Sequence, residues 1–118
     1  MTTSGGRLGA LEGTTTTWKT LYKPASGVLA TITVTACNRS ASARTIRIAQ
    51  VQSASADPTP ADGEMKLYDR SLSAAGDTAG KDVLQLTGMV LNGDNDDQVV
   101  VYVSGIDVDF TCDGVTEN

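Results

Sequence analysis

Between Val28 and Asn38 the side chains alternate in character with a period of two residues. The even-numbered positions are apolar up to Ala36, whereas threonine occupies three of the odd-numbered positions. Successive side chains of a β-strand point to opposite faces, so the pattern predicts a strand with one buried side and one solvated side. No segment of the chain shows a convincing 3.6-residue period, so the layer covering this strand is expected to consist of further strands.

Alternating apolar segments recur along the chain and are separated by turn-forming residues. The predicted strands are Trp18–Tyr22, Val28–Asn38, Ala43–Gln52, Glu64–Asp69, Val83–Leu91, Gln98–Ser104 and Ile106–Cys112. Polar segments at Asn38–Ser42 and Asn92–Asp97 are typical of hairpin turns. Ser53–Gly63 and Ser73–Asp82 are expected to be longer surface loops, and Gly88 indicates a bulge. These elements predict an all-β fold, an antiparallel β-sandwich or jelly-roll-like single domain.

Residues Met1–Thr16 are rich in glycine and threonine and contain only two large apolar side chains, Leu8 and Leu11. Such a segment has little to bury by itself, so it is predicted to be an extended N-terminal arm that becomes ordered on another surface. The β-sandwich domain would then comprise residues 17–118. Leu8, Leu11, Trp18 and Tyr22 are the candidate interface residues. Trp18 fits either a core anchor or an intersubunit hot spot, because tryptophan is enriched at such sites.

Composition argues against several classes of partner. The chain of 118 residues has a net charge of −5 and its cations are scattered, so no nucleic-acid partner is expected. The longest apolar runs are much shorter than a membrane helix, so no membrane partner is expected either. The N-terminus lacks the pattern of a secretory signal, which predicts a protein made and kept in a cytoplasm until assembly or lysis.

The absence of histidine removes the commonest general base and the commonest metal ligand. No phosphate-binding loop or nucleophile motif is present, so the chain is predicted to be no enzyme and to need no cofactor or metal. Cys37 and Cys112 are too few for a disulfide scaffold. Free thiols are favoured, with an intrachain or interchain disulfide as the alternatives.

Three further motifs have a plain and a functional interpretation. The acidic run Asp94–Asp97 offers oxygen ligands for Ca²⁺, but it lacks the glycine and distal glutamate of a calcium loop, so a solvated turn is favoured. Asp107 and Asp109 have the spacing of one strand face, which favours a solvated outer strand over a catalytic pair. Asn38–Ser40 matches a glycosylation sequon, which is interpreted as chance.

Several short stretches resemble a small family of β-sandwich virion structural proteins of tailed bacteriophages, which decorate particles or associate with fibres and tails. The similar stretches span most of the chain and are Gly6–Ala10, Thr20–Tyr22, Pro24–Gly27, Ala30–Val34, Cys37–Arg39, Ile46–Ala49, Tyr68–Asp69 and Leu86–Leu91. The chain departs from the family pattern in its longer loop before Val83 and in its C-terminal segment from Cys112.

The resemblance implies a non-enzymatic virion component whose partners are other virion proteins, such as the major capsid or tail proteins, and copies of itself. The leading hypothesis is a decoration or cement protein that docks on the capsid or tail of a virus particle. The alternative is a receptor-binding or carbohydrate-binding module of a tail or head fibre, since jelly rolls serve as lectins. Five aromatic residues are few for a sugar-stacking site.

Overall fold

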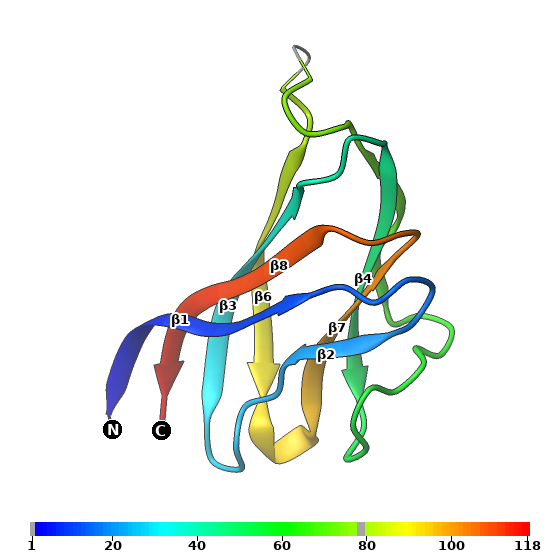
Figure 1. The fold of residues 1–118 in the computed structure, drawn as a ribbon. Helices are drawn as coiled ribbons and strands as arrows, with labels where there is room; N and C mark the ends of the chain where they lie inside the picture. Colours follow the sequence, from blue (N-terminus) through cyan, green and yellow to red (C-terminus); the bar gives the residue numbers. More distant parts are fainter. Residues whose placement is uncertain (1, 78–79) are drawn as a thin grey trace.

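The structure, a computed structural model, describes residues 2–77 and 80–118 and is built almost entirely of strands (Figure 1). The described residues form eight strands and one short 3-10 helix. The elements are β1 (Thr3–Glu12), β2 (Lys19–Tyr22), β3 (Leu29–Asn38), β4 (Arg44–Gln52), β5 (Met65–Leu72), β6 (Val83–Asn92), η1 (Gly93–Asn95), β7 (Asp97–Val103) and β8 (Val108–Glu117). No helix in these residues is long and apolar enough to cross a membrane.

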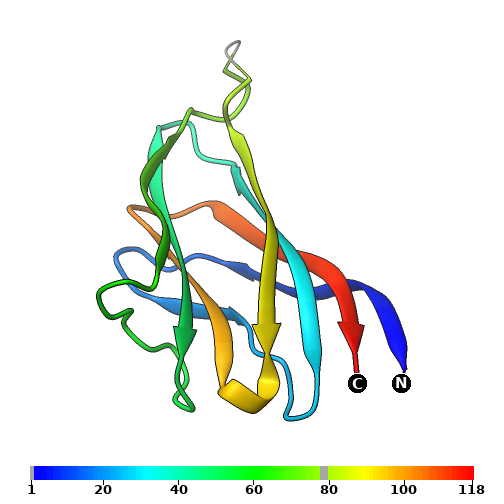
Figure 2. The same cartoon turned by 180° about the vertical axis from the view of Figure 1, so that it is seen from behind.

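The strands form two four-stranded antiparallel sheets, β1-β8-β3-β6 and β2-β7-β4-β5, packed face to face (Figures 1 and 2). Each strand of the first half pairs with its counterpart counted back from the end: β1 with β8, β2 with β7, β3 with β6 and β4 with β5. A chain folded back on itself and then rolled gives this pairing, which is the arrangement of a jelly roll. The predicted antiparallel β-sandwich is therefore confirmed.

Most connections cross from one sheet to the other, which corrects the two hairpin predictions. The turns at 38–42 and 92–97 join β3 to β4 and β6 to β7, and the two strands of each pair lie in different sheets. Among the described strands, β4 and β5 are the consecutive strands that pair with each other. Turn composition signals a sharp reversal of the chain, but it does not determine whether the flanking strands share hydrogen bonds.

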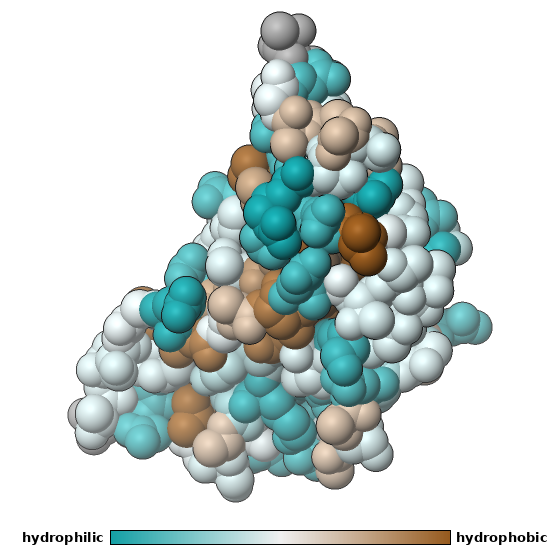
Figure 3. All heavy atoms as spheres, in the orientation of Figure 1, coloured by the Kyte–Doolittle hydropathy of each residue, from teal (hydrophilic) through white to brown (hydrophobic). Residues whose placement is uncertain are grey.

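The core lies between the inner faces of the two sheets, and β3 shows how the alternation builds it. Ala30, Ile32, Val34 and Ala36 are buried, whereas the threonines between them lie on the outer face. Phe110 is the largest fully buried side chain and packs in the same cluster. In the view of Figure 3, the remaining apolar surface forms small separate patches among neutral and hydrophilic residues.

The bulge predicted at Gly88 is present in β6. The register between β3 and β6 shifts between Ile32 and Thr33, which oppose Met89 and Thr87, so Gly88 is left without a partner. Its φ of 81° lies in the region that glycine adopts without a steric penalty.

The segment predicted to be an N-terminal arm lies within the domain. Residues Thr3–Glu12 form β1, an edge strand that pairs with β8 along its length, with a register shift between Arg7 and Gly9. Leu8 and Leu11 pack against the main core, and Gly13 is buried. The prediction weighed large apolar side chains alone, but backbone hydrogen bonds to a neighbouring strand also order a glycine-rich segment.

Candidate functional site

The outer face of sheet β2-β7-β4-β5 gathers three of the five aromatic residues around one arginine. Arg47 lies between the buried Ile46 and Ile48, so the alternation of β4 directs its side chain outward. Its cross-strand partner on β7 is Tyr102. Trp18, just before β2, places its ring centre 5.2 Å from that of Tyr102, at an interplanar angle of 45°.

The guanidinium group of Arg47 contacts two aromatic rings. Its Cζ atom lies 4.3 Å from the ring centre of Tyr68 on β5 and 4.6 Å from that of Tyr102. These distances are those of cation–π contacts. We call Trp18, Arg47, Tyr68, Asp69 and Tyr102 the aromatic–arginine surface.

Asp69 fixes the orientation of the arginine. Nε and Nη2 of Arg47 donate hydrogen bonds to the two carboxylate oxygens of Asp69 at 2.7 and 3.4 Å. These hydrogen bonds, and the negative charge of Asp69, raise the pKa of Arg47 above its usual value. The Arg47 side chain is 25% exposed and Tyr68 is 62% exposed, so the surface combines a held cation with an accessible ring.

A second apolar cluster supports this surface. Ala49, Val51 and Val100 are buried on the outer side of the sheet, and Trp18 and Met65 pack against them. Tryptophan is thus anchored on one side while it contacts Tyr102 on the other. The surface therefore rests on packed side chains that restrict the rotamers of its members.

The loop predicted at Ser53–Gly63 is fastened to β2 and β7 of the same sheet. Gln98 is fully buried, and its amide donates hydrogen bonds to the carbonyl oxygens of Ser53 and Ser55 at 2.8 and 2.9 Å. Its amide oxygen accepts a hydrogen bond of 2.6 Å from the hydroxyl of Thr20.

Asp57 forms a second attachment of this loop. Its carboxylate accepts a 2.7 Å hydrogen bond from the backbone N–H of Thr20 and pairs with Lys19 at 3.3 Å. The hydrogen bond from the Thr20 backbone, with the nearby Lys19, lowers the pKa of Asp57. Hydrogen bonds at Gln98 and Asp57 therefore hold the loop on the sheet.

The four candidate interface residues are placed on two different sides of the molecule. Leu8, Leu11 and Tyr22 are half-buried and pack against the main core, where β1 meets β2. Burial, with a smaller effect from Cys112, raises the pKa of Tyr22. Trp18 is the member of this set that lies on the aromatic–arginine surface.

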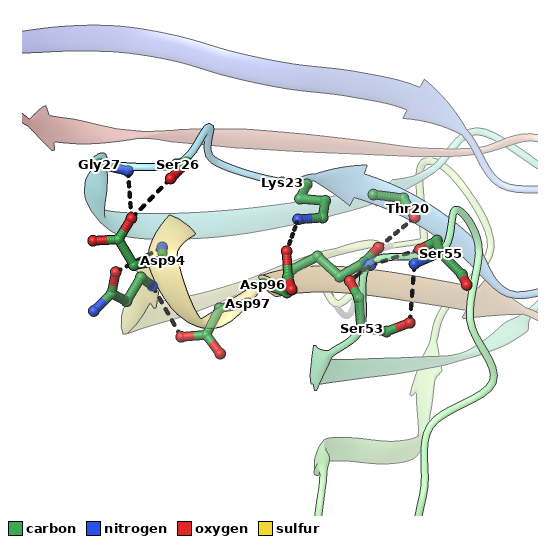
Figure 4. Close-up of polar contacts among 11 residues, drawn as sticks. Thr20, Lys23, Ser26, Gly27, Ser53, Ser55, Asp94, Asp96 and Asp97 are labelled. Atoms are coloured by element: carbon green, nitrogen blue, oxygen red, sulfur yellow. Dashed lines mark hydrogen bonds and ion pairs between the residues drawn. The ribbon is translucent and has the colours of Figure 1, made fainter.

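The carboxylates of the acidic turn point to separate partners rather than to a common centre (Figure 4). Asp94 accepts hydrogen bonds from the Ser26 hydroxyl and the Gly27 N–H at 2.9 and 2.7 Å, and Asp96 pairs with Lys23 at 3.1 Å. Asp97 is buried and accepts a 2.9 Å hydrogen bond from the Asn92 N–H. No group of three metal-ligating side chains occurs in the described residues. The turn thus fastens neighbouring segments, and Asp97 corrects the prediction of a fully solvated tip.

Asp107 and Asp109 are engaged by one arginine. Arg39 donates to Asp109 at 2.6 Å and lies 3.8 Å from Asp107 and 3.6 Å from Glu12. The hydrogen bond to Asp109 raises the pKa of Arg39. Asp109 belongs to β8, which pairs with β1 on one side and with β3 on the other, so the predicted outer strand is an inner strand of its sheet.

Asn38 is fully buried and holds the crossover from β3 to β4. Its amide donates to the carbonyl oxygens of Ser42 and Ser73 at 2.9 and 3.0 Å, and its oxygen accepts from the Ser40 N–H. The amide of the folded protein is therefore not accessible to a glycosylating enzyme.

Cys37 and Cys112 are both free thiols, as favoured from the sequence. Cys112 lies opposite Val34 and Cys37 opposite Asp109, so the two cysteines are several residues apart along the paired strands. Burial, reinforced by Asp113, raises the pKa of the Cys112 thiol to about 11.

One surface hollow of about 290 Å³ contains two carboxylate residues, Glu64 and Asp97, in its lining, together with Lys66. Glu64 already accepts hydrogen bonds from the backbone N–H groups of Ala61 and Gln52. Asp97 is bonded to the backbone of Asn92, and its second carboxylate oxygen is buried with no hydrogen-bond partner in the described part of the chain. Glu64 and Asp97 thus hold backbone segments in place.

Comparisons with models of protein families, with curated proteins and with solved structures find no match for this chain. The surface chemistry of the molecule is therefore the basis for a functional proposal. Sequence reasoning selected Trp18 but missed Arg47, Tyr68 and Tyr102. For Arg47 and Tyr102 a signal existed: each lies between two apolar residues of a predicted strand, at a position that must face outward.

Proposed function

We propose that this protein is a non-enzymatic structural protein of a virus particle, which docks on the capsid or tail through protein–protein contacts. The observation that carries the proposal is the aromatic–arginine surface, with Arg47 held between Tyr68 and Tyr102 and fixed by Asp69. Tryptophan, tyrosine and arginine are the residue types that contribute most to binding at protein interfaces. The jelly-roll pairing of the strands also supports the proposal, because jelly rolls are common in viral capsid domains.

The proposed mechanism is preorganised burial. Side chains that are already held by packing lose little conformational freedom on binding, so more of the contact energy becomes affinity. On a particle, many symmetry-related copies would bind together, and avidity would let each contact be weak. The proposed location is the virion, with other virion proteins and further copies of the chain as partners.

The test is co-sedimentation with particles produced without this chain. Tyr68→Ala removes an exposed ring, so the fold is expected to be unaffected, whereas binding should weaken by about thirtyfold if Tyr68 is a hot spot. Val115→Ala is the matched control, because Val115 is 45% exposed and lies on β8, in the other sheet. Equal binding by the two variants would refute the role of the aromatic–arginine surface.

A carbohydrate-binding module is the second candidate, and one observation favours it. Aromatic residues are few in the chain, but the fold brings Trp18, Tyr68 and Tyr102 to one sheet face. Aromatic rings on a jelly roll suit the stacking of sugars. A glycan array would distinguish the candidates: glycan binding that Tyr68→Ala removes would support this second function, and particle binding without glycan binding would support the first.

A further inference from the structure

The two sides of the sandwich are built differently. On one side the backbones of β1 and β2 are in close contact. A Cβ atom at Gly9 would collide there with the carbonyl oxygen of Leu21. On the opposite side, shown in Figure 2, the edge strands are β5 and β6. Hollows of about 390 and 120 Å³ lie between these two edges. The lining residues used below are Lys66, Arg70, Lys81, Leu84 and Leu86, and we call this surface the β5–β6 groove.

The groove collects cations that have no acidic partner. Lys19, Lys23, Arg39 and Arg47 each form ion pairs elsewhere on the molecule. In contrast, Lys66, Arg70 and Lys81 form no ion pair within the described residues, although the chain has a net charge of −5. A basic strip on an acidic protein is complementary to an acidic ligand.

The carboxylates that flank Lys66 and Arg70 in the sequence, Glu64 and Asp69, are already engaged. Glu64 accepts from two backbone N–H groups and Asp69 is bonded to Arg47. Arg70 lies opposite the buried Ile46, so its side chain is on the core-facing side of β5, at the sheet edge. The positive charge therefore faces the groove.

The edge of β6 offers backbone groups to a further strand. Val83–Thr87 pairs with β3 in an unshifted register on one side, and no strand of the described chain lies on its other side. On the C-terminal side of the Gly88 bulge, the edge of β6 is partly covered, because the Gln50 amide donates to the carbonyl oxygen of Val90 at 2.9 Å. On β5, Asp69 has a φ of 49° and the register to β4 shifts around it, which interrupts that edge.

We infer that the β5–β6 groove binds an extended acidic segment of a partner protein, which adds as a strand to the Val83–Thr87 edge of β6. Backbone hydrogen bonds to the open edge would supply affinity, as in other cases of strand addition. Acidic side chains of the segment would pair with Lys66, Arg70 and Lys81, and its apolar side chains would contact the half-buried Leu84 and Leu86. This groove is separate from the aromatic–arginine surface, so an experiment can refute binding at one of them without refuting binding at the other.

The test uses the full chain and a blocked, fluorescent peptide of alternating valine and glutamate. Saturable binding, followed by fluorescence anisotropy and weakened by salt, is the expected result. The same peptide with N-methylated backbone groups should not bind, because it cannot form the ladder. A valine–lysine peptide of equal length should bind more weakly than the glutamate peptide.

Single charge reversals locate the site. Lys66→Glu and Arg70→Glu should each weaken binding by about two- to fivefold, the range expected for exposed ion pairs. Arg7→Glu is the matched control: it changes the net charge by the same amount but lies on β1, at the other edge of the sheet. Tyr68→Ala should leave peptide binding unchanged.

Several outcomes would overturn the inference. These are no binding at millimolar peptide, equal binding of the N-methylated peptide, and equal effects of Arg7→Glu and Lys66→Glu. Concentration-dependent dimerisation of the chain alone that Lys66→Glu abolishes would also overturn it, since a second copy would then be the occupant. Sedimentation of the variants without peptide makes that distinction.

Discussion

The replacement Gln98→Leu tests whether one buried amide holds the Ser53–Gly63 loop on the sheet. Gln98 is fully buried and makes three side-chain hydrogen bonds, two to loop carbonyl oxygens and one from Thr20. Leucine has a similar size but can make none of them. The substitution therefore separates hydrogen bonding from packing at a single position.

The expected loss of stability follows from these contacts. Three hydrogen bonds at about 1 kcal/mol each amount to about 3 kcal/mol. Leucine lies opposite Val51 and recovers about 1 kcal/mol by apolar burial. The net loss in the free energy of unfolding is then about 2 kcal/mol, which corresponds to a fall in Tm of about 8 °C for a chain of this length.

Urea denaturation and calorimetry measure both quantities, and limited proteolysis reports on the loop. Gln98→Leu should be cleaved between Ser53 and Gly63 under conditions in which the native protein is resistant. The control is Gln85→Leu, because Gln85 is exposed and makes one hydrogen bond of 3.4 Å, so its change should be within about 0.5 kcal/mol. If the two variants unfold with the same free energy, the amide does not anchor the loop.

Three other predictions concern the fold. Gly114→Ala should destabilise the protein by about 1–3 kcal/mol in urea, because a Cβ there would collide with the carbonyl oxygen of Thr31; an unchanged midpoint would show that the strands can separate freely. Deleting residues 1–13 should lower the Tm of the domain, since β1 pairs with β8. An unchanged Tm would instead support the prediction that this segment is an arm outside the folded domain. Burial raises the pKa of the Cys112 thiol from 9.0 to about 11, so the unfolded chain loses this proton first. The free energy of unfolding should accordingly fall by up to about 3 kcal/mol as pH rises from 9 to 11. Subtracting the pH dependence of Cys112→Ala from that of the native protein isolates the contribution of this thiol. If the two proteins lose the same free energy over this range, burial does not raise the pKa of Cys112.

The predicted strands show where sequence patterns are informative. The Val28–Asn38 alternation and the Gly88 bulge were predicted closely, because both are local properties of the backbone. The hairpins at 38–42 and 92–97 were wrong, because pairing depends on which sheet each strand joins. The same limit affected Met1–Thr16, whose order comes from pairing with β8 at the other end of the chain.

The candidate surface was only partly predictable. Trp18 was selected from residue type, whereas its neighbours Arg47, Tyr68 and Tyr102 come from β4, β5 and β7 and meet only after the sheet has formed. The acidic turn illustrates the converse. Its residue types suggested a possible ion site, but the fold gives Asp94, Asp96 and Asp97 separate partners.

The sequence alone determined that this chain forms strands with one apolar side, and that histidine-dependent chemistry is absent. Those properties follow from side-chain period and residue type, which act over a few residues. Tertiary contacts set the strand pairing, the closed and open sides of the sandwich and the position of every side chain in the two proposed binding surfaces. Each of these depends on contacts between segments far apart in the chain, and no local pattern encodes such contacts.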